Sequence, residues 1–86
     1  MRVYLGKSGL QESFQDEFAE TTKCHKCHRK AKIMFVVSEF EVAKNHVADL
    51  YETTGIKGGL WVHDAIACAS YLCPWCFEVT SILNQA

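Results

Sequence analysis

The pattern of apolar and polar positions predicts several short β-strands. Arg2–Leu5 can form a first strand, and the apolar, partly β-branched run Lys32–Val37 is typical of a buried strand. Leu60–Val62 is a further short candidate. Ala65–Leu72 is rich in small and apolar residues, which favours a strand packed closely against a neighbouring element, although its alanines also permit a helix. The chain is therefore expected to contain a short β-sheet.

Apolar residues at helical spacing predict an N-terminal helix over Ser8–Glu20. Leu10, Phe14 and Phe18 recur every four residues and would share one helical face, while the acidic residues of this segment lie elsewhere. Gly9 makes the start of this helix difficult to fix, because glycine weakens the interior of a helix.

A second and a third helix are predicted in the centre and at the C-terminus. The sequence Ser-Glu-Phe-Glu that starts at Ser38 has the spacing of a capping box, and the apolar stripe after it predicts a helix from about Glu39 to Thr54. Near the C-terminus Trp75, Val79, Ile82 and Leu83 line up on one helical face, which predicts a terminal helix over the last ten residues.

Two Cys-x-x-Cys motifs carry the clearest chemical signal. They are Cys24-His25-Lys26-Cys27 and Cys73-Pro74-Trp75-Cys76, with 45 residues between them. Two thiolates from each motif can converge on one ion, and four thiolates in a tetrahedron form a common structural site for zinc. The sequence therefore predicts one structural Zn²⁺ with the ligands Cys24, Cys27, Cys73 and Cys76. His25 and His28 leave a mixed Cys/His ligand set open.

The order of the predicted elements resembles the treble-clef and zinc-ribbon classes of zinc finger. In the treble clef a first ligand pair lies in a knuckle, a hairpin follows, and the second pair lies in the first turn of a helix. The resemblance implies a small α+β zinc-binding domain, with two Cys-x-x-Cys knuckles around a short sheet and with the central and C-terminal helices. Residues 1–86 would form one domain, in which 1–22 are an N-terminal helical extension and 23–86 the zinc-binding core.

Charge is distributed unevenly. The net charge of −1 argues against a generally basic nucleic-acid binder. Residues 23–32 nevertheless carry a local charge of +5, from Lys23, Lys26, Arg29, Lys30 and Lys32. These side chains could contact the phosphates of a nucleic acid, or could offset the negative charge that four thiolates leave on a zinc site.

Composition places the chain among globular proteins, since hydrophobic residues make up 49% and aromatic residues 12%. The start of the chain lacks the apolar core of a signal peptide, and the apolar runs are too short to span a bilayer. We therefore expect a cytoplasmic, reduced protein without membrane contact, where paired Cys-x-x-Cys motifs favour metal over disulfides. In size and style the chain resembles small zinc proteins of bacterial mobile elements and phages.

Three other features have alternative interpretations. Trp75, inside the second motif, could be exposed and anchor a partner, or could pack over the first turn of the predicted terminal helix. Cys68 is predicted to be a buried apolar cysteine rather than a nucleophile. The sequence Cys73-Pro74-Trp75-Cys76 also resembles the active site of glutaredoxin-like redox proteins, although those folds place the motif near the N-terminus of the domain.

The functional expectation is a non-catalytic module, because no acid–base pair and no phosphate-binding glycine loop is apparent. The first hypothesis is a zinc-stabilised module that docks on a protein partner, as a regulator or an inhibitor would. The alternative is a nucleic-acid-binding zinc finger that uses the basic knuckle at residues 23–32. A second alternative is a thiol–disulfide redox protein that uses Cys73 and Cys76.

Overall fold

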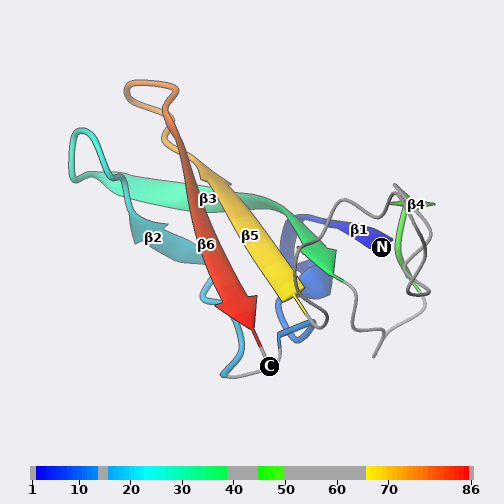
Figure 1. Ribbon diagram of the computed structural model, residues 1–86. Helices are drawn as coiled ribbons and strands as arrows, with labels where there is room; N and C mark the ends of the chain where they lie inside the picture. The colour runs from blue at the N-terminus through cyan, green and yellow to red at the C-terminus, as the bar shows by residue number, and fades with distance from the viewer. Residues whose placement is uncertain (1, 14–15, 39–44, 50–65, 86) are drawn as a thin grey trace, which may run out of the picture.

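The computed structural model describes residues 2–13, 16–38, 45–49 and 66–85. Within these residues the chain forms an antiparallel β-sheet and one short 3-10 helix, without an α-helix (Figure 1). The elements are β1 (Arg2–Leu5), η1 (Gly6–Gly9), β2 (Thr21–Lys23), β3 (Lys30–Ser38), β4 (Ala48–Asp49), β5 (Ile66–Leu72) and β6 (Val79–Gln85). The predicted strands at 2–5 and 32–37 are thereby confirmed, and the strand predicted at 65–72 is confirmed from Ile66 onward.

The sheet is built around β3, its longest strand. The strand order is β4-β1-β3-β5-β6. Two strands share one edge of β3: β2 pairs with the beginning of β3, and β1 pairs with the end of β3. A register shift between Ile33 and Phe35 interrupts the pairing of β3 with β5. The turns of the two hairpins, β2–β3 and β5–β6, lie at the same end of the sheet (Figure 1).

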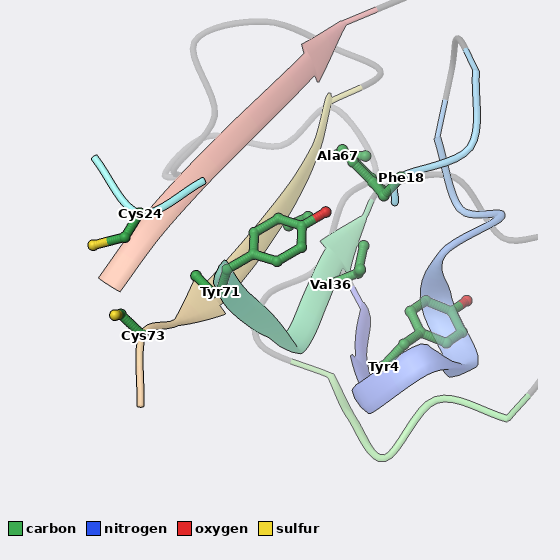
Figure 2. Close-up of a cluster of buried hydrophobic side chains, with 9 residues drawn as sticks. Tyr4, Phe18, Cys24, Val36, Ala67, Tyr71 and Cys73 are labelled. Atoms are coloured by element: carbon green, nitrogen blue, oxygen red, sulfur yellow. The ribbon is translucent and has the colours of Figure 1, made fainter. Parts of the chain in front are cut away.

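One face of the sheet, which we term the inner face, carries the core. The register aligns a row across β1, β3, β5 and β6 that consists of Tyr4, Val36, Ala69 and Ile82. Residues paired on adjacent strands point to the same face, and the first three of this row are fully buried. Tyr71 of β5 is also fully buried, and Figure 2 shows the cluster extending from Tyr4 towards Cys24 and Cys73.

Irregular chain covers the inner face. Gly9 of η1 is buried, and a Cβ added there would lie only 2.5 Å from the Cβ of Tyr4, so this close approach requires glycine. Phe18 is buried in the core, although no regular element contains it. The hydroxyl of Tyr71 donates to the carbonyl of Ala19 at 2.7 Å, which fixes the segment before β2 against the sheet.

The opposite, outer face of the sheet carries apolar residues and is exposed at its β1 and β6 sides, whereas Ile66 and Ser70 on β5 are buried there. The register aligns on it a row that consists of Val3, Val37, Cys68 and Leu83. Leu5, Val79 and Leu83, at the β1 and β6 sides of this face, are each about half exposed, at 57%, 47% and 56%. Apolar surface of this kind is informative when it is contiguous, because soluble proteins seldom leave it uncovered without a use.

The prediction of an α+β fold with a C-terminal helix is wrong. The last described residues form β6, which pairs with β5 from Val79 to Gln85. The spacing of Val79, Ile82 and Leu83 fits a helical face, but in β6 Ile82 lies on the inner face and the other two lie on the outer face. An apolar run on both faces is ambiguous between helix and strand, and here the long ladder with β5 decides for the strand.

The other two predicted helices are not found either. Residues 10–13 and 16–20 of the predicted helix Ser8–Glu20 are turns and irregular chain. Within the predicted central helix Glu39–Thr54, Ala48–Asp49 forms β4 and pairs with β1. Residues 39–44 and 50–54, together with the predicted strand Leu60–Val62, lie outside the described residues. In the part of the chain that is described, no helix is long and apolar enough to cross a lipid bilayer.

Candidate metal centre

Each Cys-x-x-Cys motif forms the turn of one hairpin. Lys23 pairs with Lys30, and Leu72 pairs with Val79, so residues 24–29 and 73–78 are the loops that connect paired strands. The register of the two hairpins therefore places both motifs at one end of the sheet, although 45 residues separate them in the chain.

The two loops have the same backbone hydrogen bonds. In the first, the Cys24 N–H donates to the Arg29 carbonyl at 2.7 Å and the His28 N–H donates to the Cys24 carbonyl at 3.1 Å. The second loop has both bonds at the corresponding positions: the Cys73 N–H donates to the Glu78 carbonyl at 3.0 Å, and the Phe77 N–H donates to the Cys73 carbonyl at 2.8 Å. The two knuckles are thus built alike from different sequences.

Both knuckles end in a left-handed residue. The φ angles are 66° at His28 and 59° at Phe77, each directly after the second cysteine of its motif. Left-handed backbone is unfavourable for residues that carry a Cβ, and glycine would adopt it without strain. The knuckle geometry therefore imposes a local cost, which the contacts of the folded chain must offset.

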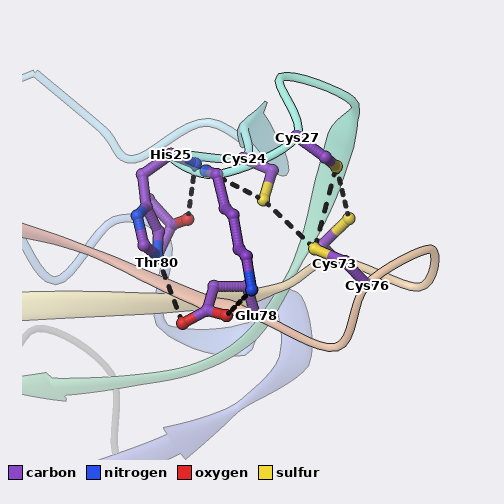
Figure 3. Close-up of polar contacts among 8 residues, drawn as sticks. Cys24, His25, Cys27, Cys73, Cys76, Glu78 and Thr80 are labelled. Atoms are coloured by element: carbon purple, nitrogen blue, oxygen red, sulfur yellow. Dashed lines mark hydrogen bonds and ion pairs between the residues drawn. The ribbon is translucent and has the colours of Figure 1, made fainter.

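The four cysteine sulfurs converge on one point (Figure 3). The Sγ atoms of Cys24 and Cys76 are 3.7 Å apart, those of Cys27 and Cys73 are 3.4 Å apart, and those of Cys27 and Cys76 are 3.7 Å apart. All four lie within 4.8 Å of one another, and none is in a disulfide. For zinc–sulfur bonds of about 2.3 Å, the edges of a regular tetrahedron are about 3.8 Å long. The sulfur cluster therefore has nearly the size of a tetrahedral metal site.

Polar contacts hold the two knuckles against each other (Figure 3). The backbone N–H of His25 donates to Oγ1 of Thr80 at 3.1 Å, which links the first knuckle to β6. The Glu78 carboxylate lies 3.6 Å from Nε2 of His25 and 3.7 Å from Nζ of Lys26. The guanidinium of Arg29 lies 4.7 Å from the centre of the Trp75 ring, a cation–π distance. Sequence reasoning missed Glu78 and Thr80, because only the folded hairpins bring them next to the first motif.

Backbone N–H groups favour the ionised form of the first cysteine in each motif. The N–H of Cys27 points at the sulfur of Cys24 and, with that of Lys26, lowers the pKa of Cys24 to about 6 against the opposing effect of burial. For Cys73, burial raises the pKa, but N–H groups of Cys76 and Trp75 outweigh it, so the pKa is lowered.

Cys76 behaves in the opposite way. The N–H of Glu78 favours its thiolate, but burial and the three neighbouring sulfurs together outweigh that bond and raise the pKa of Cys76 to about 12. Without a metal, the cluster therefore keeps at least one proton among four closely spaced sulfurs. A divalent cation would replace that proton with two positive charges, which is the chemistry that a thiolate site offers to zinc.

The predicted ligands are brought together, and the two alternative ligands are not. Within the described residues, the side chains that are close enough together to hold a metal ion are those of Cys24, Cys27, Cys73 and Cys76. His25 lies beside Glu78 instead, and His28 lines a surface groove. Cys68, predicted to be buried, is half-buried on the outer face, where burial raises its pKa.

The basic residues of 23–32 do not act as one patch. Lys26 faces Glu78, whereas Lys23, Arg29 and Lys30 line a groove of about 370 Å³ together with Thr21, Thr22 and His28. Lys32 follows two residues later on β3 and is exposed. Trp75 is 67% exposed, and the terminal helix over which it was expected to pack is replaced by β6.

No protein-family model, curated protein or solved structure matches the chain.

Proposed function

We propose that the chain is a non-catalytic binding module whose fold is held by one structural zinc ion. The observation that carries the proposal is the set of four cysteine sulfurs, 3.4 to 3.7 Å apart where they are closest and all within 4.8 Å. Four thiolates close a tetrahedral zinc site and leave no open position for a water or a substrate, which is typical of structural rather than catalytic zinc.

A structural ion suits this chain because its core is thin. Of the ten buried hydrophobic residues described, three are alanines and two are the cysteines Cys24 and Cys73. Small apolar cores seldom supply more than a few kcal/mol of net stability, and a zinc–thiolate site can add on the order of 10 kcal/mol.

Metal content and cysteine protection test the zinc site. Native mass spectrometry is expected to show one zinc per chain, with Cys24, Cys27, Cys73 and Cys76 protected from a thiol reagent until a chelator is added. Cys73→Ser should leave the chain largely unfolded, whereas Cys68→Ser, on the half-buried outer face, should cost no more than about 1 kcal/mol. An equal loss of stability in both variants, or an unchanged fold after chelation, would contradict a structural role for the ion.

The proposed partner is a protein that presents an extended apolar segment to β6 and the outer face. Among the described residues β6 pairs with β5 alone, so its other edge offers unpaired N–H and C=O groups. From Val79 to Gln85 the strand contains no charged residue and no proline, the usual protection of an exposed edge. Val79, Leu83 and the 67%-exposed Trp75 give this surface apolar anchors beside the edge.

The docking surface can be tested by affinity capture followed by hydrogen exchange on the complex. A partner that adds a strand is expected to protect the amides of β6 from exchange. Its capture should be abolished by Ser81→Lys, and it should bind the Trp75→Ala variant more weakly. Ala19→Lys adds the same charge on an exposed residue before β2 and should leave capture intact. Capture that Ser81→Lys and Ala19→Lys affect equally, or protection elsewhere on the chain, contradicts this surface.

Nucleic-acid binding is a second candidate, because the groove lined by Lys23, Arg29 and Lys30 favours an anion. The redox alternative has weaker support. Cys73, the thiol that would attack a disulfide, has no exposed surface, and catalytic thiols need access.

A further inference from the structure

The groove beside the first knuckle has the chemistry of a phosphate site. It has a volume of about 370 Å³ and is lined by Thr21, Thr22, Lys23, His28, Arg29 and Lys30. The pairing of Thr22 with Ala31 and of Lys23 with Lys30 places its walls on β2 and the start of β3. Cations and hydroxyl groups in one concave surface can both neutralise a phosphate and donate hydrogen bonds to it.

The cations of this groove have no acidic partner among the described residues. The described carboxylates that form ion pairs are directed to Arg2, Lys7, His25, Lys26 and His46. Glu78, the acid nearest to the knuckles, is engaged by His25 and Lys26 and does not line the groove. The positive charges of Lys23, Arg29 and Lys30 are therefore available to an external anion.

An exposed aromatic ring adjoins the groove. Arg29 lines the groove and also lies 4.7 Å from the centre of the Trp75 ring, so one guanidinium joins the two features. The indole is 67% exposed. A basic groove that follows a phosphate backbone, with an aromatic ring on which an unpaired base can stack, is the usual design for binding single-stranded nucleic acid. Bases inside a duplex are already stacked and cannot use such a ring.

We propose that this groove binds the phosphodiester backbone of a single-stranded nucleic acid and that Trp75 stacks on one of its bases. The inference rests on the second candidate function and deepens it by naming the class of nucleic acid, and it concerns a different surface from the proposed protein partner. Trp75 would serve either surface, but Lys30 lines only the groove and Ser81 lies only on β6.

The salt dependence of binding to fluorescein-labelled oligo(dT) and oligo(U) tests the proposal, measured by anisotropy with the full zinc-loaded chain. If Lys23, Arg29 and Lys30 neutralise about three phosphates, affinity should fall roughly 20-fold between about 50 and 200 mM salt. Lys30→Ser should weaken binding at low salt and reduce that fall to roughly 7-fold, since about two contacts remain. Trp75→Ala should weaken binding about 5- to 100-fold and keep the 20-fold fall, because stacking releases no counterions.

Matched controls separate this site from general charge attraction. Lys7→Ser removes the same charge from a lysine that lies outside the groove and pairs with Glu20 at 3.3 Å, so binding should be unchanged. A duplex of oligo(dT) with oligo(dA) should bind more weakly than either single strand. No binding at about 50 mM salt, equal effects of Lys7→Ser and Lys30→Ser, or a preference for the duplex would each overturn the proposal. If the chain binds no oligonucleotide but still contains one zinc ion, the nucleic-acid proposal is wrong and the proposed zinc site is unaffected.

Discussion

Phe77 is held in a left-handed conformation, with a φ of 59°, although its side chain is 76% exposed. The position follows the second cysteine of a knuckle, where the backbone turns so that two loop bonds can form. An aromatic residue gains little there from burial and still bears the steric cost of its Cβ. Phe77 is thus unfavourable for the backbone conformation at this position, which is typical of residues that a binding surface uses.

Phe77→Gly is expected to stabilise the zinc-loaded chain by about 0.5–1 kcal/mol, since glycine adopts this φ without strain. Val79→Gly, two residues later in β6, should instead destabilise it by about 1 kcal/mol, because glycine weakens a strand. Chemical denaturation of both variants under saturating zinc measures the difference. Loss of stability in both would mean that the Phe77 ring has contacts worth more than the strain.

Gly9, unlike Phe77, is a residue whose identity the structure requires. A Cβ at this position would lie 2.5 Å from the Cβ of Tyr4 and 3.0 Å from that of Val36. Gly9→Ala should therefore destabilise the chain by about 1–3 kcal/mol, as overpacked cores do. Lys7→Ala, on an exposed residue of the same 3-10 helix, should change stability by less than about 0.5 kcal/mol. Thermal unfolding of the two variants tests this, and equal melting temperatures would contradict the close packing.

At the scale of elements, three strands and the grouping of the four cysteines were predictable, whereas β2, β4 and β6 were not, and the predicted helices are not found in the described residues. β1, β3 and β5 follow from β-branched and apolar runs, and the four cysteines follow from motif spacing alone. Leu10 and Phe18, by contrast, do contact the core as their spacing suggested, but they do so from irregular chain, with the Phe18 N–H donating to the Leu10 carbonyl at 3.0 Å. Apolar spacing predicts which residues are buried more securely than the element that carries them.

The irregular segment before β2 is held by few bonds. The Tyr71 hydroxyl donates to the Ala19 carbonyl at 2.7 Å, and the Ile33 N–H donates to the Glu20 carbonyl at 2.9 Å. Tyr71→Phe keeps the ring but removes the first bond, which should cost about 1–1.5 kcal/mol. Hydrogen exchange should then quicken at the amides of Phe18 and Ile33, whereas the amides that form the ladder between β5 and β6 should stay protected. Uniform quickening would show that Tyr71 supports the whole sheet instead.

For the whole molecule, the four-cysteine cluster and the sheet depend on each other. The strands carry the knuckles to one end, and the knuckles hold together two hairpins that are distant in sequence. This pairing of distant segments was foreseen from the cysteines, whereas the cross-contacts through Glu78 and Thr80 were not, because they depend on the register of β6. Zinc uptake should consequently be coupled to protonation of the cluster as well as to folding.

That coupling predicts a change of slope in the pH dependence of zinc affinity. In the metal-free folded chain Cys24 has its pKa lowered from 9.0 to about 6, and Cys76 has its pKa raised to about 12. The lowered pKa of Cys24 stabilises the metal-free fold above pH 9, an effect that is lost as the pH falls through about 6. The raised pKa of Cys76 has the opposite sign: it stabilises that fold below pH 9, and the effect is lost as the pH rises towards 12.

Zinc binding requires both thiolates, so it displaces the Cys76 proton throughout the range from pH 5 to 8 but displaces the Cys24 proton only below about pH 6. The logarithm of the zinc affinity should therefore rise with pH, with a slope that is larger by about one below pH 6 than above it. Competition with a chelator of known affinity at several pH values measures the slope, and calorimetry in two buffers counts the protons released. A wild-type slope that is constant from pH 5 to 8 would contradict the lowered pKa of Cys24.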